Sequence, residues 1–419
     1  MDRFEYRDGE LYCEEVSVEE ICRDVGTPVY IYSHGTILDH YTKLERAFSE
    51  IDHLICFSIK SNSNLAVIRS LVKAGSGVDI VSGGELYRAL RAGADPRKIV
   101  YASVGKTYDE IRAALETGIL MFNVESRPEA EAIDKVAGEM GVKAKVAFRI
   151  NPDVDPHTHK HITTGKKETK FGIPIDRALE TYIWARENLK NLDICGVHCH
   201  IGSQITSVQP YVKALSKIVL LVEDLRRAGF QINMLNIGGG LGIIYKDETP
   251  STADDFAEAT LPYIKKTGCK LLLEPGRFIV GNAGILATEV IYVKRTPTKN
   301  FLIVDAAMND LIRPAFYDSY HRILPVKIRT DRKDLFDVVG PVCETGDYFA
   351  KDREVSLVEP GEFLAIFSAG AYGFTMSSNY NSRPRAAEVM VIDDRYYIVR
   401  KRETYLDLIR GEAIPGELM

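Results

Sequence analysis

The chain has 419 residues, 45% of them hydrophobic and 27% charged, with a formal net charge of −6. Its length exceeds what one hydrophobic core usually serves, so two domains are expected, and the acidic balance without a long basic run argues against a nucleic-acid surface. There is no 18-residue apolar run, no apolar signal core and no CxxC spacing among seven cysteines, which predicts a cytoplasmic protein with reduced thiols and no membrane segment.

Short apolar runs, each ending in a polar residue or a glycine, recur through the first two thirds of the chain. Eight are predicted to be buried strands, over residues 54–60, 77–85, 99–103, 120–126, 145–153, 194–203, 234–240 and 270–277. Helical periodicity occupies the segments between them, and the segments over 64–75 and 83–94 end in glycine-containing stops after basic residues. This alternation predicts a (β/α)8 TIM-type barrel, with a doubly wound sheet as the alternative.

Active sites of such barrels lie at the carboxyl ends of the strands. The residues that the sequence places there are Lys60, Asp79, Ser103, Asn123, Arg149, His200, Gly238, Gly239, Gly240 and Glu274. The candidate site therefore combines an amine, carboxylates, an imidazole and glycine-rich backbone.

Lys60 is the first candidate for a reactive group. It ends the apolar run of "LICFSIKSNSN" (54–64), so little water is expected around it, and burial lowers the pKa of an amine and makes it a better nucleophile. A lone lysine at the end of a strand is more often a solvated strand terminus. However, Glu274 of "EPGR" ends the eighth strand, which neighbours the first if the barrel closes.

Two further motifs suggest an anion and an aromatic ring. The glycines of "NIGGGLG" (236–242) let backbone N–H groups approach an anion, although a tight turn is also consistent and GxGxxG spacing is absent. His198 and His200 alternate along "VHCHIGS" (197–203), so both are expected to face one way. A metal site that also uses "HTHKH" (157–161) is not favoured because no HExxH or Cys/His framework is present, and an imidazole packed on a cofactor ring is preferred.

Beyond about Val280 the sequence becomes rich in strand-like segments. We expect residues 280–419 to form a second, mostly antiparallel β domain, joined by residues 1–32, which leaves 33–279 for the barrel. The motifs of this domain contribute candidates for an accessible thiol, an anion ligand and a carboxylate clamp: Cys343 and Glu344 of "CETGD", Tyr372 of "AGAYGFTMSSNYN", and Arg313 with Tyr317 of "DLIRPAFYDSYH". The long polar loop over 151–172 is expected to be functional.

Taken in order, these motifs resemble those of the fold-type III pyridoxal 5′-phosphate (PLP) decarboxylases over essentially the whole chain. The matching segments are "FSIKSN", "HCHIGSQ", "IGGGLG", "EPGR", "RPAFYDSYH", "CETGD" and "AGAYGFTMSSNYNSRPR". The chain departs from the family at the lysine motif, where Ser58 and Ser61 replace two alanines. Both replacements are small, so little consequence is expected.

The resemblance implies a role for each candidate. Lys60 would carry PLP covalently, Glu274 would pair with the pyridine nitrogen, and His200 would stack on the ring. The phosphate would be held by Ser203 and Tyr372 and by the backbone of Gly238, Gly239, Gly240, Gly276 and Arg277. Asp79 and Arg149 would support the lysine and the ring. No metal is expected.

The expected reaction is decarboxylation of meso-2,6-diaminopimelate to L-lysine and CO2, with Arg277, Arg313 and Tyr317 on the distal carboxylate, Glu344 on the distal ammonium, and Tyr372 also at the substrate. The family resemblance implies a homodimer with shared active sites, in which Cys343 and Glu344 come from the partner subunit. The alternatives are decarboxylation of ornithine, arginine or carboxynorspermidine, a non-catalytic PLP-binding regulatory protein, and a metal-dependent barrel hydrolase.

Overall fold

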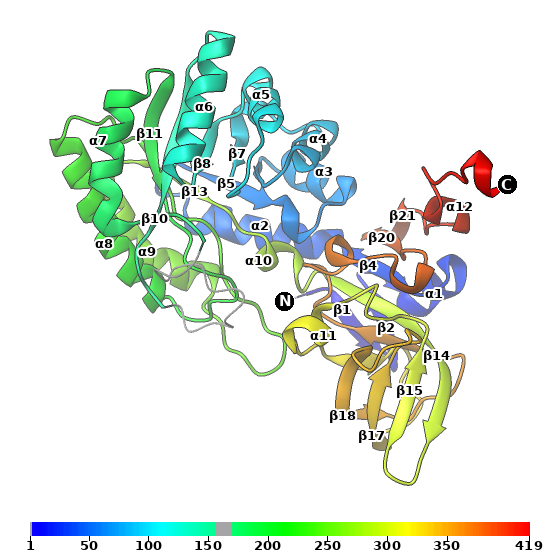
Figure 1. The fold of residues 1–419 in the computed structure, drawn as a ribbon. Helices are drawn as coiled ribbons and strands as arrows, with labels where there is room; N and C mark the ends of the chain where they lie inside the picture. The colour runs from blue at the N-terminus through cyan, green and yellow to red at the C-terminus, as the bar shows by residue number, and fades with distance from the viewer. Residues whose placement is uncertain (1, 156–169) are drawn as a thin grey trace. The chain divides into compact units, whose positions relative to one another are not determined.

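The computed structural model describes residues 2–155 and 170–419, which fall into two compact units (Figure 1). One unit is continuous, Ile37–Val280, and the other combines Met1–Thr36 with Gly281–Met419. Most of the predicted loop over 151–172, including the histidines of "HTHKH", lies outside the described residues.

Eight parallel strands form the centre of the continuous unit. They are β5 (His53–Ser58), β6 (Gly77–Ile80), β7 (Ile99–Tyr101), β8 (Met121–Val124), β9 (Ala144–Asn151), β11 (Leu192–His198), β12 (Met234–Asn236) and β13 (Lys270–Leu273). The ring closes because β8 pairs with β9 and β13 pairs with both β12 and β5. The predicted barrel is confirmed, and the doubly wound alternative is wrong because it requires an open sheet.

Helices surround these strands (Figure 1). They are α2 (His34–Ala47), α3 (Leu65–Lys73), α4 (Gly83–Arg91), α5 (Tyr108–Thr117), α6 (Arg127–Met140), α7 (Ala178–Asn188), α8 (Gln209–Arg227), α9 (Ala253–Thr267) and α10 (Arg277–Val280). Hydroxyl caps begin several of them: Ser82, Thr107 and Ser126 each accept the N–H of the residue three positions on. These caps define the residue at which each helix begins. Because the strands are parallel, their polar carboxyl ends lie at one face of the barrel.

Strand register decides which polar side chains become neighbours. Ser58 pairs with Asp79 across β5 and β6, and His198 of β11 pairs with Arg149 on one side and Asn236 on the other. A buried apolar cluster from six of the strands supports this arrangement: Leu54, Cys56, Val100, Met121, Ala147, Cys195 and Leu272. The barrel therefore presents its polar residues at positions that packing holds in place.

The second unit is built on a mostly antiparallel sheet, as predicted. Its strands are β1 (Phe4–Arg7), β2 (Glu10–Cys13), β3 (Val16–Ser17), β4 (Val29–Ser33), β14 (Gly284–Arg295), β15 (Asn300–Val304), β16 (Ile323–Pro325), β17 (Lys333–Val339), β18 (Tyr348–Ser356), β19 (Phe363–Ile366), β20 (Ala387–Ile392) and β21 (Arg395–Arg400). Its helices are α1 (Val18–Val25), α11 (Arg313–Tyr317) and α12 (Tyr405–Leu408). Strand β4 from the N-terminal segment lies between β14 and β20. Within the described residues, no helix of either unit is long and apolar enough to span a membrane.

Candidate active site

Lys60 and Asp79 form an ion pair at the ends of β5 and β6. The Lys60 Nζ lies 3.0 Å from Asp79 Oδ2, and Ser58 Oγ donates to the same oxygen at 2.7 Å. Asp79 is fully buried, whereas 39% of the Lys60 side chain is exposed. The prediction of a lysine with little water around it is therefore wrong, because Lys60 lies in a short turn beyond the strand rather than inside it.

The Asp79 carboxyl group is sensitive to its neighbours. Burial and the nearby Glu274 carboxylate raise the pKa of Asp79, while Lys60 and the Ser58 hydroxyl act in the opposite direction. A positive charge on Lys60 therefore favours the ionised form of Asp79, and loss of that charge favours a proton on the carboxyl.

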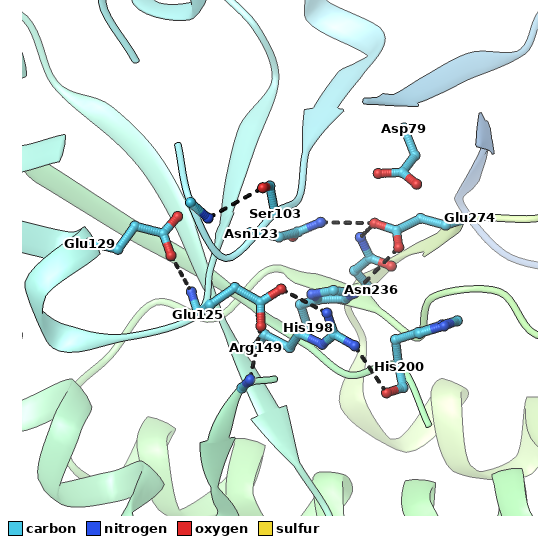
Figure 2. A network of polar contacts seen from close by, with 12 residues as sticks. Asp79, Ser103, Asn123, Glu125, Glu129, Arg149, His198, His200, Asn236 and Glu274 are labelled. Carbon is cyan, nitrogen blue, oxygen red and sulfur yellow. Dashed lines mark hydrogen bonds and ion pairs between the residues drawn. The ribbon is translucent and has the colours of Figure 1, made fainter. Parts of the chain in front are cut away.

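Glu274 follows β13 and is held by two side-chain amides (Figure 2). Asn123 of β8 and Asn236 of β12 donate to its Oε1 at 2.8 Å and 2.7 Å. Its Oε2 has a longer contact of 3.4 Å with Nε2 of His198. Residues 38 and 151 positions away in the sequence thus converge on one carboxylate oxygen.

Neighbouring groups favour the ionised form of Glu274 despite its burial. Burial alone would favour the neutral acid, but His198, Lys60 and the Asn236 amide together hold the pKa of Glu274 well below its usual range. A negative charge at this end of the barrel stabilises the protonated form of a basic group placed beside it.

His200 is fixed as a neutral imidazole. The N–H of Gly239 donates to its Nδ1 at 3.1 Å, so the ring proton of the neutral form lies on Nε2. Burial, and after it the positive charges of Arg149 and Lys60, lower the pKa of His200 well below its usual value. An uncharged ring of this kind can pack on an aromatic group at little desolvation cost.

The glycine-rich turn after β12 is shaped by close backbone approach. A side-chain carbon on Gly239 would lie 2.1 Å from the Glu274 carbonyl oxygen, and one on Gly240, whose φ is +111°, would lie 2.4 Å from the Gly202 carbonyl oxygen. Gln204 joins the loop after β11 to the turn after β12. Its amide group donates to the Ile243 carbonyl at 2.6 Å and accepts the Ile243 N–H at 3.1 Å. Only glycine fits these positions without displacing the neighbouring loops.

Arg277 and Ser203 meet beside this turn. The Arg277 guanidinium donates to Ser203 Oγ at 3.1 Å and to the Tyr245 hydroxyl at 2.6 Å. Arg277 is buried, at the start of α10 and one residue after Gly276. A hydroxyl and glycine backbone are donor types that bind a phosphate group, and the Arg277 guanidinium beside them is suited to a carboxylate.

The barrel site fits PLP on three observations. The glycine turn and the Ser203 hydroxyl offer donors for a phosphate, and the Glu274 carboxylate is a partner for a protonated ring nitrogen. In addition, buried Oδ1 atoms of Asp79 and Asn123 have no hydrogen-bond partner among the described residues, which is consistent with a polar group completing the site.

The remaining predicted residues belong to the second unit. Arg313 is buried in α11, donates to Ser319 Oγ at 3.2 Å and lies 5.8 Å from the centre of the Tyr317 ring. Cys343 is exposed, and the adjacent Glu344 accepts the Tyr380 hydroxyl at 2.8 Å. A further predicted residue, Tyr372, has a positive φ of 57°. The roles predicted for these side chains stay predictions.

Sequence reasoning missed several residues of the site. Asn236 and Glu125 each stand at or next to a strand end, the signal that identified the other candidates, but neither was assigned a role. Ser58, which the sequence marks only as a replacement for alanine, donates to Asp79. As for metals, the described residues contain no group of three His, Cys, Asp or Glu side chains able to hold an ion.

Comparison with known proteins identifies the class. Residues 34–281 match the family model described as the pyridoxal-binding domain of pyridoxal-dependent decarboxylases. The chain belongs to this family of PLP-dependent carboxy-lyases, so the predictions of a PLP cofactor and of a decarboxylase are confirmed. The hydrolase and regulatory-protein alternatives lose their support.

Within the family, the full-length similarity is to diaminopimelate decarboxylases. The relative from Aquifex aeolicus is 51% identical over 402 residues, covering 96% of this chain and 95% of the relative. The Vibrio cholerae relative is 48% identical and covers 100% of both chains. The structure of the M. jannaschii enzyme in co-complex with L-lysine superposes with a TM-score of 0.95 at 39% identity, covering 100% of this chain and 99% of that one.

Proposed function

We propose that this protein decarboxylates meso-2,6-diaminopimelate to L-lysine and CO2, the last step of lysine biosynthesis. Relatives of that name cover the full chain at about half identity, and one of the structures similar to it contains L-lysine, the product of the reaction. The observation that carries the chemistry is the buried Glu274 carboxyl group, held by Asn123 and Asn236 at the barrel end that also carries the Lys60–Asp79 pair.

Each barrel residue has a role that follows from its surroundings. PLP, when bound, supplies a ring that accepts the electron pair released as the bond between Cα and the carboxylate breaks. Lys60 would attach the cofactor, and Asp79 would balance the charge of its amine. Glu274 would favour a proton on the ring nitrogen, and the neutral His200 would support the ring. The phosphate would be held by Ser203 and Tyr372 and by the backbone of Gly238, Gly239, Gly240, Gly276 and Arg277.

The substrate end that does not react requires a carboxylate clamp. Diaminopimelate carries a carboxylate and an ammonium there, whereas ornithine and arginine carry only a cation. We assign the carboxylate to Arg313, Tyr317 and Arg277, because a planar guanidinium bonds both carboxylate oxygens. Glu344 accepts from the distal ammonium, and Tyr372 also contacts the substrate.

We further propose a cytoplasmic homodimer in which Cys343 and Glu344 complete the partner subunit's active site. Exposure of both residues supports this arrangement, since a group that serves another subunit must lie at the surface. Cys343 is the one exposed cysteine among the seven, all of which are free thiols. Either the Cys343 thiol or the Lys60 amine returns a proton to Cα.

The test of substrate choice offers meso-diaminopimelate, ornithine, arginine and carboxynorspermidine separately and compares kcat/KM. Diaminopimelate should exceed ornithine and arginine by about 10⁴-fold or more, because a substrate without the carboxylate leaves the clamp unpaired. Arg313→Lys should retain the PLP spectrum and lose most activity. Arg322→Lys is the control, because Arg322 also lies on an aromatic face, 4.4 Å from the centre of the Phe367 ring, and this variant should retain both the spectrum and the activity. If ornithine or arginine equals diaminopimelate, the enzyme is instead a decarboxylase of that amino acid.

A further inference from the structure

Arg149, expected to support the cofactor ring, forms a buried ion pair with Glu125, a residue that has no part in the functions assigned above. Glu125 directly follows β8, and its Oε1 accepts Arg149 Nη1 of β9 at 2.7 Å (Figure 2). The Glu125 side chain is 3% exposed and that of Arg149 is 8% exposed. Removing either partner would leave a buried charge without its counter-ion, so the pair constrains both side chains.

Both oxygens of Glu125 are committed to donors. While Oε1 accepts from Arg149, Oε2 accepts the backbone N–H of Gly172 at 2.8 Å. The Arg149 guanidinium also lies 4.7 Å from the centre of the Phe171 ring. Arg149 is therefore fixed by a carboxylate on one side and by an aromatic ring on another.

Arg149 in turn reaches the backbone of His200. Its Nη2 lies 3.5 Å from the His200 carbonyl oxygen, a long hydrogen bond, while the Gly239 N–H holds the imidazole of the same residue. The peptide and the ring of His200 are thus held by different groups. Of these, only the contact to the peptide depends on Glu125.

A second buried ion pair holds Glu125 itself. Glu129 of α6 accepts the Glu125 backbone N–H at 2.8 Å, and Lys106 binds the other oxygen of Glu129. Lys106 also donates to the carbonyl of Asn123. Figure 2 shows the contact of the Asn123 amide with Glu274. The contacts that link Lys106, Glu129 and Glu125 therefore begin at the end of β8, the strand whose Asn123 binds Glu274.

We infer that Glu125 is a positioning residue for the cofactor site: by orienting Arg149 it sets the place of His200, and it contacts neither cofactor nor substrate itself. This inference rests on the proposed assignment of His200 to the PLP ring. The two donors bind different oxygens of Glu125, so Glu125→Gln turns an NH2 group toward one of them and cannot hold Arg149 and the Gly172 N–H together.

The experiment titrates PLP into the apoprotein and records both the dissociation constant and the circular dichroism of the PLP absorption band. Glu125→Gln should weaken PLP binding by about 10-fold or more and change the dichroism. Glu139→Gln is the matched control, because it alters an Arg–Glu pair of the same 2.7 Å length, with Arg112, that is exposed. It should match the wild type in both measurements.

Double variants separate positioning from a general loss of stability. In an Arg149→Gln background, Glu125→Gln should change PLP affinity by less than about twofold, because its effect passes through Arg149. Glu125→Asp, which keeps the charge and both acceptors, should recover part of the affinity.

Three results would overturn the inference. They are wild-type affinity and dichroism in Glu125→Gln, an equal loss of affinity in both backgrounds, and failure of both Glu125→Gln and Glu125→Asp to fold. Absence of PLP binding by the wild-type protein would instead refute the proposed function.

Discussion

Glu274→Gln should leave PLP bound and slow decarboxylation, and the local geometry predicts by how much. In the wild type, Oε1 accepts from both Asn123 and Asn236, which leaves Oε2 as the oxygen that neither amide engages. A glutamine must keep its carbonyl oxygen toward the two amides, because its own NH2 group would there face two donors. The NH2 group consequently replaces Oε2, and the negative charge is lost.

The expected loss is that of one charge-assisted hydrogen bond to the protonated ring nitrogen. Such a bond contributes about 1.5–3 kcal/mol, which corresponds to about 10- to 100-fold in rate. The cost falls on the rate more than on PLP affinity, since the phosphate donors and Lys60 are untouched. We would measure single-turnover decarboxylation of diaminopimelate per bound PLP, with cofactor content read from the absorption spectrum.

Glu388→Gln is a suitable control. Glu388 is a buried glutamate of the second unit that pairs with Arg400 and accepts the Tyr32 hydroxyl, so its replacement tests the general effect of removing a buried carboxylate. Its rate per bound PLP should remain that of the wild type. A Glu274→Gln enzyme that retains PLP and turns over within about twofold of wild type would refute the role of Glu274.

Three further predictions address attachment, assembly and pH. Borohydride reduction should leave a phosphopyridoxyl mass adduct on the peptide containing Lys60, and an adduct on another lysine would refute that assignment. Lys60→Ala and Cys343→Ala proteins should each be nearly inactive but regain activity on mixing, because one site of the mixed C2 dimer is wholly wild type; inactivity despite demonstrated subunit exchange would place Cys343 elsewhere. Burial raises the pKa of Glu85 from 4.5 to about 7, so the folded state holds this proton more tightly and loses stability as the pH rises through that range. Glu85→Gln should therefore raise Tm at pH 8, with a difference that shrinks as the pH falls toward 4.5, and an equal shift at both pH values would contradict this.

The barrel and most of the candidate site could be predicted from the sequence because their signals are local. An apolar run that ends in Lys60, Asp79 or Glu274 marks both a buried strand and its carboxyl end, and parallel strands in a barrel bring all such ends to one face. The antiparallel second unit was equally readable, since the runs of β-forming residues after Val280 contain few helical periods.

Local signals, however, carry no information about which distant residues share a partner. The two amides on Glu274 come from β8 and β12, and the pairing of Glu125 with Arg149 depends on the neighbouring ends of β8 and β9. Strand register and barrel closure decide these contacts, and both follow from packing of the whole unit.

Solvent exposure was the property that the sequence alone could not supply. The apolar run before Lys60 predicted a lysine with little water around it, but the chain turns after β5, and 39% of the side chain is exposed while Asp79 beside it is fully buried. The sequence by itself thus determined which residues stand at the strand ends and the class of chemistry that they offer. Only the tertiary structure decided which of them pair, which charges are buried and how neighbouring groups favour the ionised form of Glu274, because these depend on the positions of groups far apart in the chain.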